Sequence, residues 1–259
     1  MPAHGGGWML GDLNGDDLLC RVVAEHTNSA IVSIDYRLTP EYKWPTQLED
    51  CMKVYKWVRE RSHSIAMTDL TNASQAHQNA SSFHGDPNRF YTLGGSAGGT
   101  LALAIARQVM KDPELKPGVK GIVAMVPATV HYDNVPEKYQ VAYNAYTDNA
   151  KGAPVLDGES MQTFFHHAGA DPKDASMFPL LATDLHKSFP PTYFTSCEFD
   201  PLRDDAYAME SALKEAGVPT KHDHYKGLPH YFWIFPSVPE GQQYVGNLLA
   251  GIGWIQSQM

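Results

Sequence analysis

The chain has few cysteines, fewer basic than acidic residues, and no long apolar run. Three cysteines, Cys20, Cys51 and Cys197, occur among the 259 residues. This odd number, in apolar segments, favours buried reduced thiols over a disulfide framework and so predicts a cytoplasmic location. The 20 basic and 29 acidic residues give a formal charge of −9, which excludes attraction to nucleic acid as a partner. No run approaches the roughly 20 apolar residues of a membrane span, and no signal-peptide pattern is present, so we expect a soluble protein.

Secretion stays open because the chain contains two potential glycosylation sequons, at Asn72 and Asn79. Both lie in a polar stretch without periodicity, "TDLTNASQAHQNASSFHGD", which we interpret as an exposed insertion rather than a domain linker. Short sequons also arise by chance, so the sequence leaves their use undecided.

Apolar runs of strand length alternate with helical patterns, which predicts a parallel sheet flanked by helices. A length of 259 residues with 43% hydrophobic content suits one α/β domain over 1–259. We expect strands at 30–38, 89–93, 121–129, 191–199 and 221–225. Helices are expected after Pro45 and over 97–110, 204–216 and 241–259. Residues 131–190 are predicted to be a helical, cap-like excursion from the sheet.

Ser96 lies in "GGSAGG", between a predicted strand and a predicted helix. This is the context that a G-x-S-x-G nucleophile elbow requires, because the serine adopts a strained conformation and its neighbours must be small. A glycine-rich turn or a phosphate-binding loop is the alternative, but the lysine of a P-loop is absent. We therefore interpret Ser96 as a nucleophile.

A serine nucleophile needs a base and an orienting acid, which in this arrangement follow it along the chain. Asp200 comes directly after the strand at 191–199, and His230 follows the next strand, so both are predicted at the carboxyl edge of the sheet. The neighbouring carboxylates Asp204 and Asp205 are expected to cap and charge the following helix instead. His222 and His224 are expected to be ordinary surface residues of a strand.

The motif "HGGGW" supplies a second glycine-rich loop, at residues 4–8. An oxyanion hole needs at least two N–H donors, and we assign this role to Gly6, Gly7 and Ala97. Gly5 is expected to belong to the same oxyanion hole by making the turn of the loop. His4 is expected to fix the loop by hydrogen bonds. Six aromatic residues are candidates to line an apolar substrate pocket, although aromatics at such density also suit a core: Trp8, Phe164, Phe165, Tyr231, Phe232 and Trp233.

Five motifs, "HGGGW", "DYRLTPEYKWP", "GGSAGG", "EFDPLRDDA" and "GLPHYF", together resemble the hormone-sensitive lipase family of α/β-hydrolases. The resemblance covers nearly the whole chain and implies an α/β-hydrolase fold and a carboxylesterase acting on short to medium acyl esters. It implies a small-molecule ester substrate, no cofactor, a triad of Ser96, Asp200 and His230, and an oxyanion hole of HGGG and Ala97. Asp35, Tyr36 and Arg37 would fix the loops around the site.

The sequence departs from the family pattern in two places. Gly95 stands where relatives more often have an acidic residue, a change expected to loosen the elbow. Relatives also carry cap helices and sheet strands ahead of HGGG, whereas Met1-Pro2-Ala3 precede it here. We therefore expect the strand that normally lies between 30–38 and 90–95 to be lost, leaving two exposed edges. Whether residues are missing ahead of Met1, or another chain or segment fills the gap, stays open, and with it whether the chain is active.

Other functions remain as alternatives. Some relatives have become dehydratases or small-molecule-binding pseudoenzymes, although receptors of that kind lack the histidine that is present here as His230. A metal hydrolase using His222, His224 and His230 lacks a carboxylate or cysteine set with ligand spacing, so we assign no metal. The sequence does not decide the natural substrate, the acyl-chain preference, or whether the chain forms a homodimer.

Overall fold

The computed structural model describes residues 1–63, 86, 89–115 and 118–259. Nearly all of the predicted insertion, with Asn72 and Asn79, therefore lies outside the described residues. None of the helices in these ranges is long and apolar enough to cross a membrane.

Five parallel strands form one sheet in the order β1-β2-β3-β4-β5. Their register aligns Leu93 with Val123 and Val123 with Tyr193. The central strands are buried on both faces, which is why they appear in the sequence as continuous apolar runs. The bounds are β1 (Pro2–Ala3), β2 (Phe90–Gly95), β3 (Val119–Met125), β4 (Thr192–Phe199) and β5 (Thr220–Pro229).

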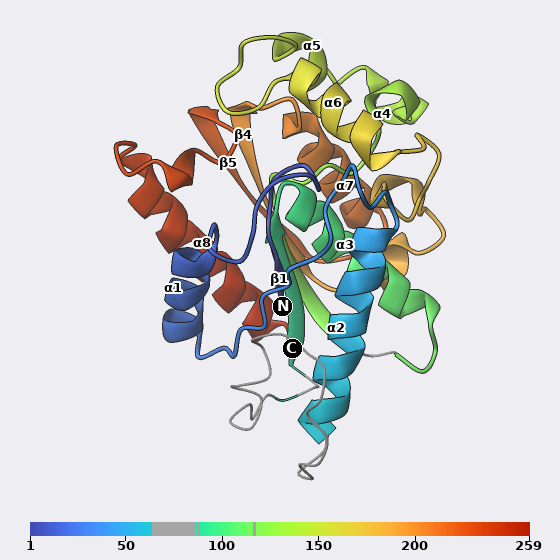
Figure 1. Ribbon diagram of the computed structural model, residues 1–259, viewed down its shortest axis with the longest axis vertical. Helices are drawn as coiled ribbons and strands as arrows, with labels where there is room; N and C mark the ends of the chain where they lie inside the picture. The colour runs from blue at the N-terminus through green and yellow to red at the C-terminus, as the bar shows by residue number, and fades with distance from the viewer. Residues whose placement is uncertain (64–85, 87–88, 116–117) are drawn as a thin grey trace.

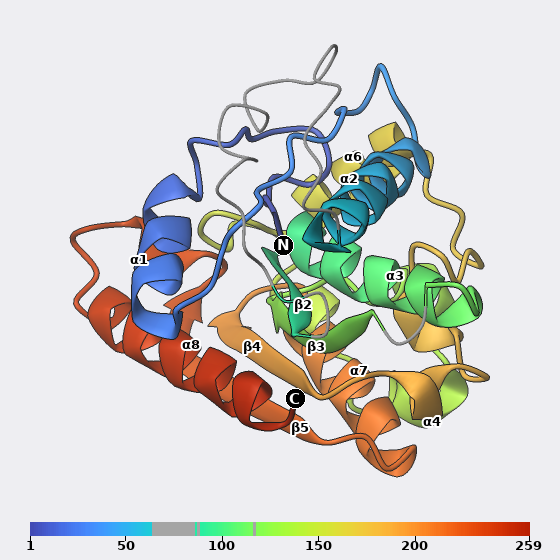
Figure 2. The same cartoon turned by 90° about the horizontal axis from the view of Figure 1, so that it is seen from below.

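Helices cover both faces of this sheet (Figure 2). Alternate residues of β3 point to opposite sides: Val123 and Met125 pack in the cluster that includes α8, and Ile122 and Ala124 in the cluster with α3 and α7. The face with α8 (Glu240–Ser257) also carries α1 (Asp17–Thr27). The other carries α2 (Thr46–His63), α3 (Ala97–Lys111) and α7 (Arg203–Glu215). These layers confirm the predicted fold class.

Residues 131–190 form the predicted helical excursion, which lies beyond the carboxyl ends of the strands (Figure 1). Its longest helix is α6 (Gly158–Ala168). Asp157 is the N-cap residue of α6, and its carboxylate accepts the N–H of Ser160. The remaining elements are η2 (Tyr132–Asn134), α4 (Glu137–Gln140), α5 (Ala145–Asp148), η3 (Pro179–Leu181) and η4 (His186–Ser188). The excursion is thus placed over the edge of the sheet where the predicted site lies.

The predictions about the first strands were wrong. The position between Ile34 and β2 is occupied by Pro2–Ala3, which pair with Leu93 and Gly94. Residues 30–38 do not form a strand and meet the sheet at a single bridge, Ala3 to Ile34. The reason is geometric, because a two-residue β1 offers too short an edge for a longer ladder.

Asp204 and Asp205 lie in the first turn of α7 and so charge its start as expected, but neither caps the helix, because their carboxylates accept hydrogen bonds from other segments. Asp204 Oδ2 accepts the N–H groups of Asn144 and Ala145, each at 2.7 Å. Asp205 is fully buried, and its Oδ1 accepts the Thr129 N–H at 2.7 Å. These two carboxylates therefore tie the start of α7 to the excursion and to the residues that lead into it.

Asp205 provides a test of this attachment. Burial raises the pKa of Asp205 to about 7, although hydrogen bonds from two backbone N–H groups and Tyr143 favour the charged form. Because the native pKa lies above the unfolded one, this carboxyl contributes most to stability at low pH, and the contribution is lost as the pH rises through 7. Between pH 5 and pH 8 the wild type should lose roughly 2 kcal/mol of unfolding free energy through this carboxyl. Asp205→Asn has no carboxyl to titrate and should not show that loss when both proteins are unfolded with urea at each pH.

Asp205→Ala is the companion variant. It leaves two buried N–H groups without an acceptor and should cost about 3 kcal/mol at pH 5, whereas asparagine keeps that acceptor. Equal pH slopes for wild type and Asp205→Asn would contradict the assignment.

Candidate active site

Ser96 lies in the turn that joins β2 to α3, with φ 55° and ψ −123°. This is a strained conformation for a residue with a side chain. Two glycines around it permit close backbone contacts: a Cβ on Gly94 would lie 2.3 Å from the Gly98 carbonyl oxygen, and a Cβ on Gly98 would lie 2.0 Å from that of Ala3. The turn therefore has the backbone geometry predicted for a nucleophile elbow.

The HGGG loop follows β1 directly and contains two glycines with left-handed φ angles, 107° at Gly6 and 60° at Gly7. A Cβ on Gly6 would lie 2.2 Å from the Leu10 carbonyl oxygen, and one on Gly7 would lie 2.4 Å from the Phe164 ring. The turn is closed by N–H groups of Met9 and Leu10, which donate to the Gly6 carbonyl at 3.0 and 2.8 Å. Glycine is therefore required at both positions.

Several hydrogen bonds hold the HGGG loop in place. His4 Nδ1 lies 2.8 Å from the Gly5 carbonyl oxygen, and the His4 ring stacks on Tyr36 with a centroid distance of 4.2 Å. The Tyr36 hydroxyl donates to the His4 carbonyl at 2.8 Å, and the Thr39 N–H donates to the Trp8 carbonyl at 2.9 Å. His4 and Tyr36 thus have the loop-fixing contacts that the sequence suggested, whereas Arg37 pairs with Asp50 of α2.

Asp200 and His230 meet at the carboxyl ends of β4 and β5. Asp200 Oδ2 lies 2.7 Å from His230 Nδ1, and the two side chains are only 0% and 5% exposed. The other carboxylate oxygen accepts the Leu202 N–H at 2.8 Å, which fixes the carboxyl group. Since an ionised carboxylate can only accept, Nδ1 donates the proton and Nε2 of His230 keeps a free lone pair.

Ser96 and His230 line one cavity of about 320 Å³, together with Gly5, Gly6 and Gly7. Ala97, the first residue of α3, follows Ser96 and has an N–H without an acceptor inside the helix. Thus the structure brings the predicted serine, histidine and HGGG loop to one cavity, and Asp200 to the histidine.

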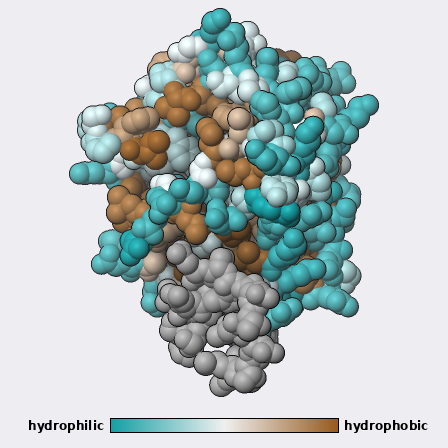
Figure 3. All heavy atoms as spheres, in the orientation of Figure 1, coloured by the Kyte–Doolittle hydropathy of each residue, from teal (hydrophilic) through white to brown (hydrophobic). Residues whose placement is uncertain are grey.

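The cavity wall is largely apolar, and the sequence predicted little of it. Tyr231 lines it as expected, but Trp8 is not among the lining residues: its indole is 1% exposed and stacks near Phe165 with a centroid distance of 5.9 Å. Phe164 lines the cavity as expected, whereas Phe165, Phe232 and Trp233 are not among its lining residues. The further apolar lining residues are Leu10, Val155, Leu156 and Ile234. They come from three separate segments, so no local pattern could have grouped them. Figure 3 shows hydrophobic surface on this face, below α5 and α6.

Two carboxylates, Asp12 and Asp16, add negative charge to the cavity wall. Burial raises the pKa of Asp16, while nearby His4 and the Gly5 N–H act in the opposite direction. The Gly5 N–H therefore lies beside the Asp16 carboxylate.

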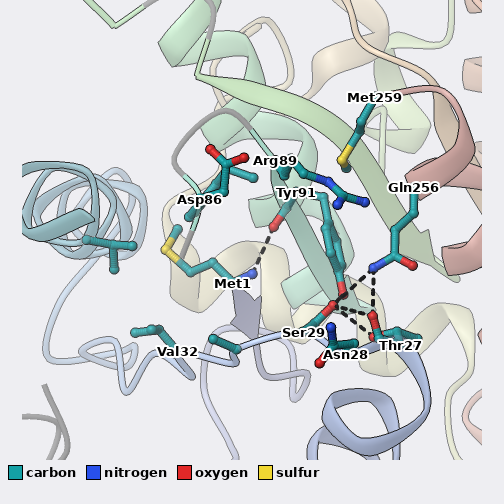
Figure 4. Close-up of a pocket in the computed structure, with 13 residues that line it drawn as sticks. Met1, Thr27, Asn28, Ser29, Val32, Asp86, Arg89, Tyr91, Gln256 and Met259 are labelled. Carbon is teal, nitrogen blue, oxygen red and sulfur yellow. Dashed lines mark hydrogen bonds between the residues drawn. The ribbon is translucent and has the colours of Figure 1, made fainter. Parts of the chain in front are cut away.

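A second cavity of about 410 Å³ lies at the other end of the sheet, near the start of β2 (Figure 4). Its polar groups bind one another: the Tyr91 hydroxyl donates to Ser29 Oγ at 3.0 Å, and Gln256 Nε2 donates to the Thr27 carbonyl at 2.9 Å. None of the predicted catalytic side chains lines it. Its size therefore does not make it the candidate active site.

The expectation that His222 and His224 are ordinary surface residues was wrong. His222 Nε2 lies 2.8 Å from Ser196 Oγ, and its Nδ1 lies 3.0 Å from Glu210 Oε2. His224 Nδ1 also contacts Ser196 Oγ, at 2.9 Å. Ser196 is fully buried, so this set has the connectivity of a triad but no access to a substrate. Among the described residues, no group of three histidine, cysteine or acidic side chains is placed to hold a metal ion.

Comparison with known proteins agrees with this geometry. A family model described as alpha/beta hydrolase fold matches residues 1–234. The chain is 62% identical over 256 residues to a versiconal hemiacetal acetate esterase of Dothistroma septosporum, covering 99% of this chain and 73% of the relative. The chain belongs to the α/β-hydrolase family.

Two solved structures are similar to the chain. A vibralactone cyclase superposes with a TM-score of 0.84 at 33% identity, covering 99% of this chain and 71% of the cyclase. A thermostable carboxylesterase from a metagenomic library gives a TM-score of 0.79 at 29% identity, covering 99% and 78%. Within the family, this α/β-hydrolase is a carboxylic ester hydrolase of the serine carboxylesterase type.

Because β1 lies so close to the turn at Ser96 in this α/β-hydrolase, adding a methyl group at Gly98 should lower the stability of the fold. Gly98→Ala would place a Cβ 2.0 Å from the Ala3 carbonyl oxygen and 2.7 Å from that of His4, so β1 and the HGGG loop must move. The unfolding free energy from urea denaturation should fall by about 2–4 kcal/mol.

Gly253→Ala is the matched control, because a Cβ there meets nothing within 4 Å. It should leave stability unchanged or slightly higher, since alanine is the better helix residue. If Gly98→Ala were as stable as Gly253→Ala, the contact between β1 and the elbow would be refuted.

Proposed function

We propose that the chain hydrolyses short acyl esters of bulky apolar alcohols, with Ser96 as nucleophile, His230 as general base and Asp200 as the residue that orients His230. The observation that carries this proposal is the buried bond of 2.7 Å between Asp200 and His230, with His230 and Ser96 lining one cavity. In that arrangement the imidazole can accept a proton only through Nε2.

Each proposed step assigns a proton to one of these groups. Ser96 Oγ attacks the ester carbonyl carbon while His230 Nε2 takes the serine proton, and Asp200 stabilises the resulting imidazolium. N–H groups of Gly6, Gly7 and Ala97 stabilise the oxyanion. The C–O bond to the alcohol then breaks, and His230 returns the proton to the leaving oxygen. A water molecule, deprotonated by His230, cleaves the acyl-enzyme and releases the acid and Ser96.

The substrate class rests on the cavity wall and on one relative. Leu10, Val155 and Ile234 are each at least half exposed at the cavity, which suits an apolar alcohol portion. Asp12 and Asp16 place negative charge on the same wall and disfavour substrates that carry a carboxylate. The 62% identical relative is named for the acetate ester of a hemiacetal, which supports a short acyl group.

The binding-only alternative receives little support. A pseudoenzyme of that kind would not need an intact acid–base pair, whereas His230 and Asp200 remain hydrogen-bonded beside Ser96.

Ser96→Ala tests the proposal with 4-nitrophenyl acetate as substrate. Removing the nucleophile should lower kcat/KM by about 10⁴-fold or more, because the acyl-enzyme cannot form. Circular dichroism and the urea midpoint should show that the variant is folded.

Ser196→Ala is the matched control, since Ser196 also contacts two histidines but is fully buried outside the cavity. It should keep kcat/KM within about threefold of wild type. Undiminished hydrolysis by a folded Ser96→Ala enzyme would sink the proposal.

A further inference from the structure

Tyr231 directly follows His230 and has an unusual environment. Its backbone is left-handed, with φ 57° and ψ 25°, and its ring lies 5.3 Å from the His230 ring and 4.5 Å from the Trp233 ring. The hydroxyl is buried and has no hydrogen-bond partner among the described residues. Burial raises the pKa of Tyr231 well above its usual value, so the hydroxyl keeps its proton and cannot act as a base.

The hydroxyl end of Tyr231 fills a notch formed by two glycines. A Cβ on Gly95 would lie 2.1 Å from the Tyr231 hydroxyl oxygen and 2.6 Å from Cζ, and a Cβ on Gly5 would lie 2.7 Å from the same oxygen. That Gly5 position is also 3.2 Å from the Gly95 carbonyl oxygen. The segment after β5 that carries His230, the HGGG loop and the turn at Ser96 therefore meet at the hydroxyl end of Tyr231.

We propose that Tyr231 is a positioning residue. Its phenol ring packs into the notch between Gly5 and Gly95 and thereby sets the distance of His230 from the HGGG loop and from Ser96. This inference rests on the proposed function of Ser96 and His230. It also accounts for the glycine at position 95: the space that a side chain there would need is occupied by the tyrosine hydroxyl.

The contacts are steric, so the inference distinguishes the ring from its hydroxyl. The hydroxyl makes no hydrogen bond in the described residues, and phenylalanine keeps the ring in the notch. Alanine removes the ring but has the same left-handed backbone cost as tyrosine, because both carry a Cβ. Gly95 itself is not left-handed, so a methyl group there acts through the contact with Tyr231 and not through backbone strain.

A double-mutant cycle with Gly95→Ala and Tyr231→Ala tests the proposal on 4-nitrophenyl acetate. Each single variant should lower kcat about 10- to 100-fold and change KM by less than about threefold, because small displacements of catalytic groups affect the chemical step. In the Tyr231→Ala background the added methyl has no ring to meet. The double variant should therefore have the kcat of Tyr231→Ala, within about threefold.

A conservative variant and a control accompany the cycle. Tyr231→Phe should recover most of the kcat that Tyr231→Ala loses, because the ring stays in the notch. Gly246→Ala adds a methyl that meets nothing within 4 Å and should leave kcat unchanged. If the losses from Gly95→Ala and Tyr231→Ala multiply in the double variant, or if Tyr231→Ala keeps wild-type kcat, the positioning role is overturned.

Proton NMR separates failure of this inference from failure of the proposed function. The His230 Nδ1 proton, held by Asp200, should give a strongly downfield signal in wild type and Tyr231→Phe that is shifted or broadened in Tyr231→Ala. This signal does not require turnover. A wild type without esterase activity would refute the proposed function, whereas an unchanged signal in Tyr231→Ala would refute the positioning role.

Discussion

Backbone contact between β1 and the turn at Ser96 is the constraint on which the rest of the site depends. Gly98 lets the Ala3 carbonyl approach the start of α3, and Gly94 lets the two arms of the turn meet. Ser96 can hold its strained φ of 55° only because these neighbours fix the backbone around it. The same contact sets where the HGGG loop leaves the sheet, since His4 directly follows β1.

The parts of the site that depend on local backbone requirements could be predicted from the sequence. The two glycine-rich motifs were informative because left-handed angles at Gly6 and Gly7 and close contacts at Gly98 exclude other residues. Asp200 and His230 were found for a related reason: parallel strands end at one edge, so residues that follow two strands are brought together there. The structure indeed joins them by a hydrogen bond of 2.7 Å.

The remaining features depend on contacts between distant segments, which no local pattern records. Asp205 resembled a helix-capping residue, yet its partners are the N–H groups of Thr129 and Val130, more than 70 residues away. His222 alternates along an edge strand as a surface residue would, but it packs against Glu210 of α7. The strand expected at 30–38 failed because its length depends on the short β1 beside it. The apolar wall of the cavity likewise exists only after folding.

Two buried serines with histidine neighbours, Ser96 and Ser196, make the central claim directly measurable. The folded wild-type protein would be treated with a fluorophosphonate, digested, and analysed by mass spectrometry to locate the adduct. Ser96 and His230 both line the cavity, whereas Ser196 does not line it. We therefore predict one adduct per chain, on Ser96. An adduct on Ser196, or an unlabelled protein that still hydrolyses esters, would contradict the account.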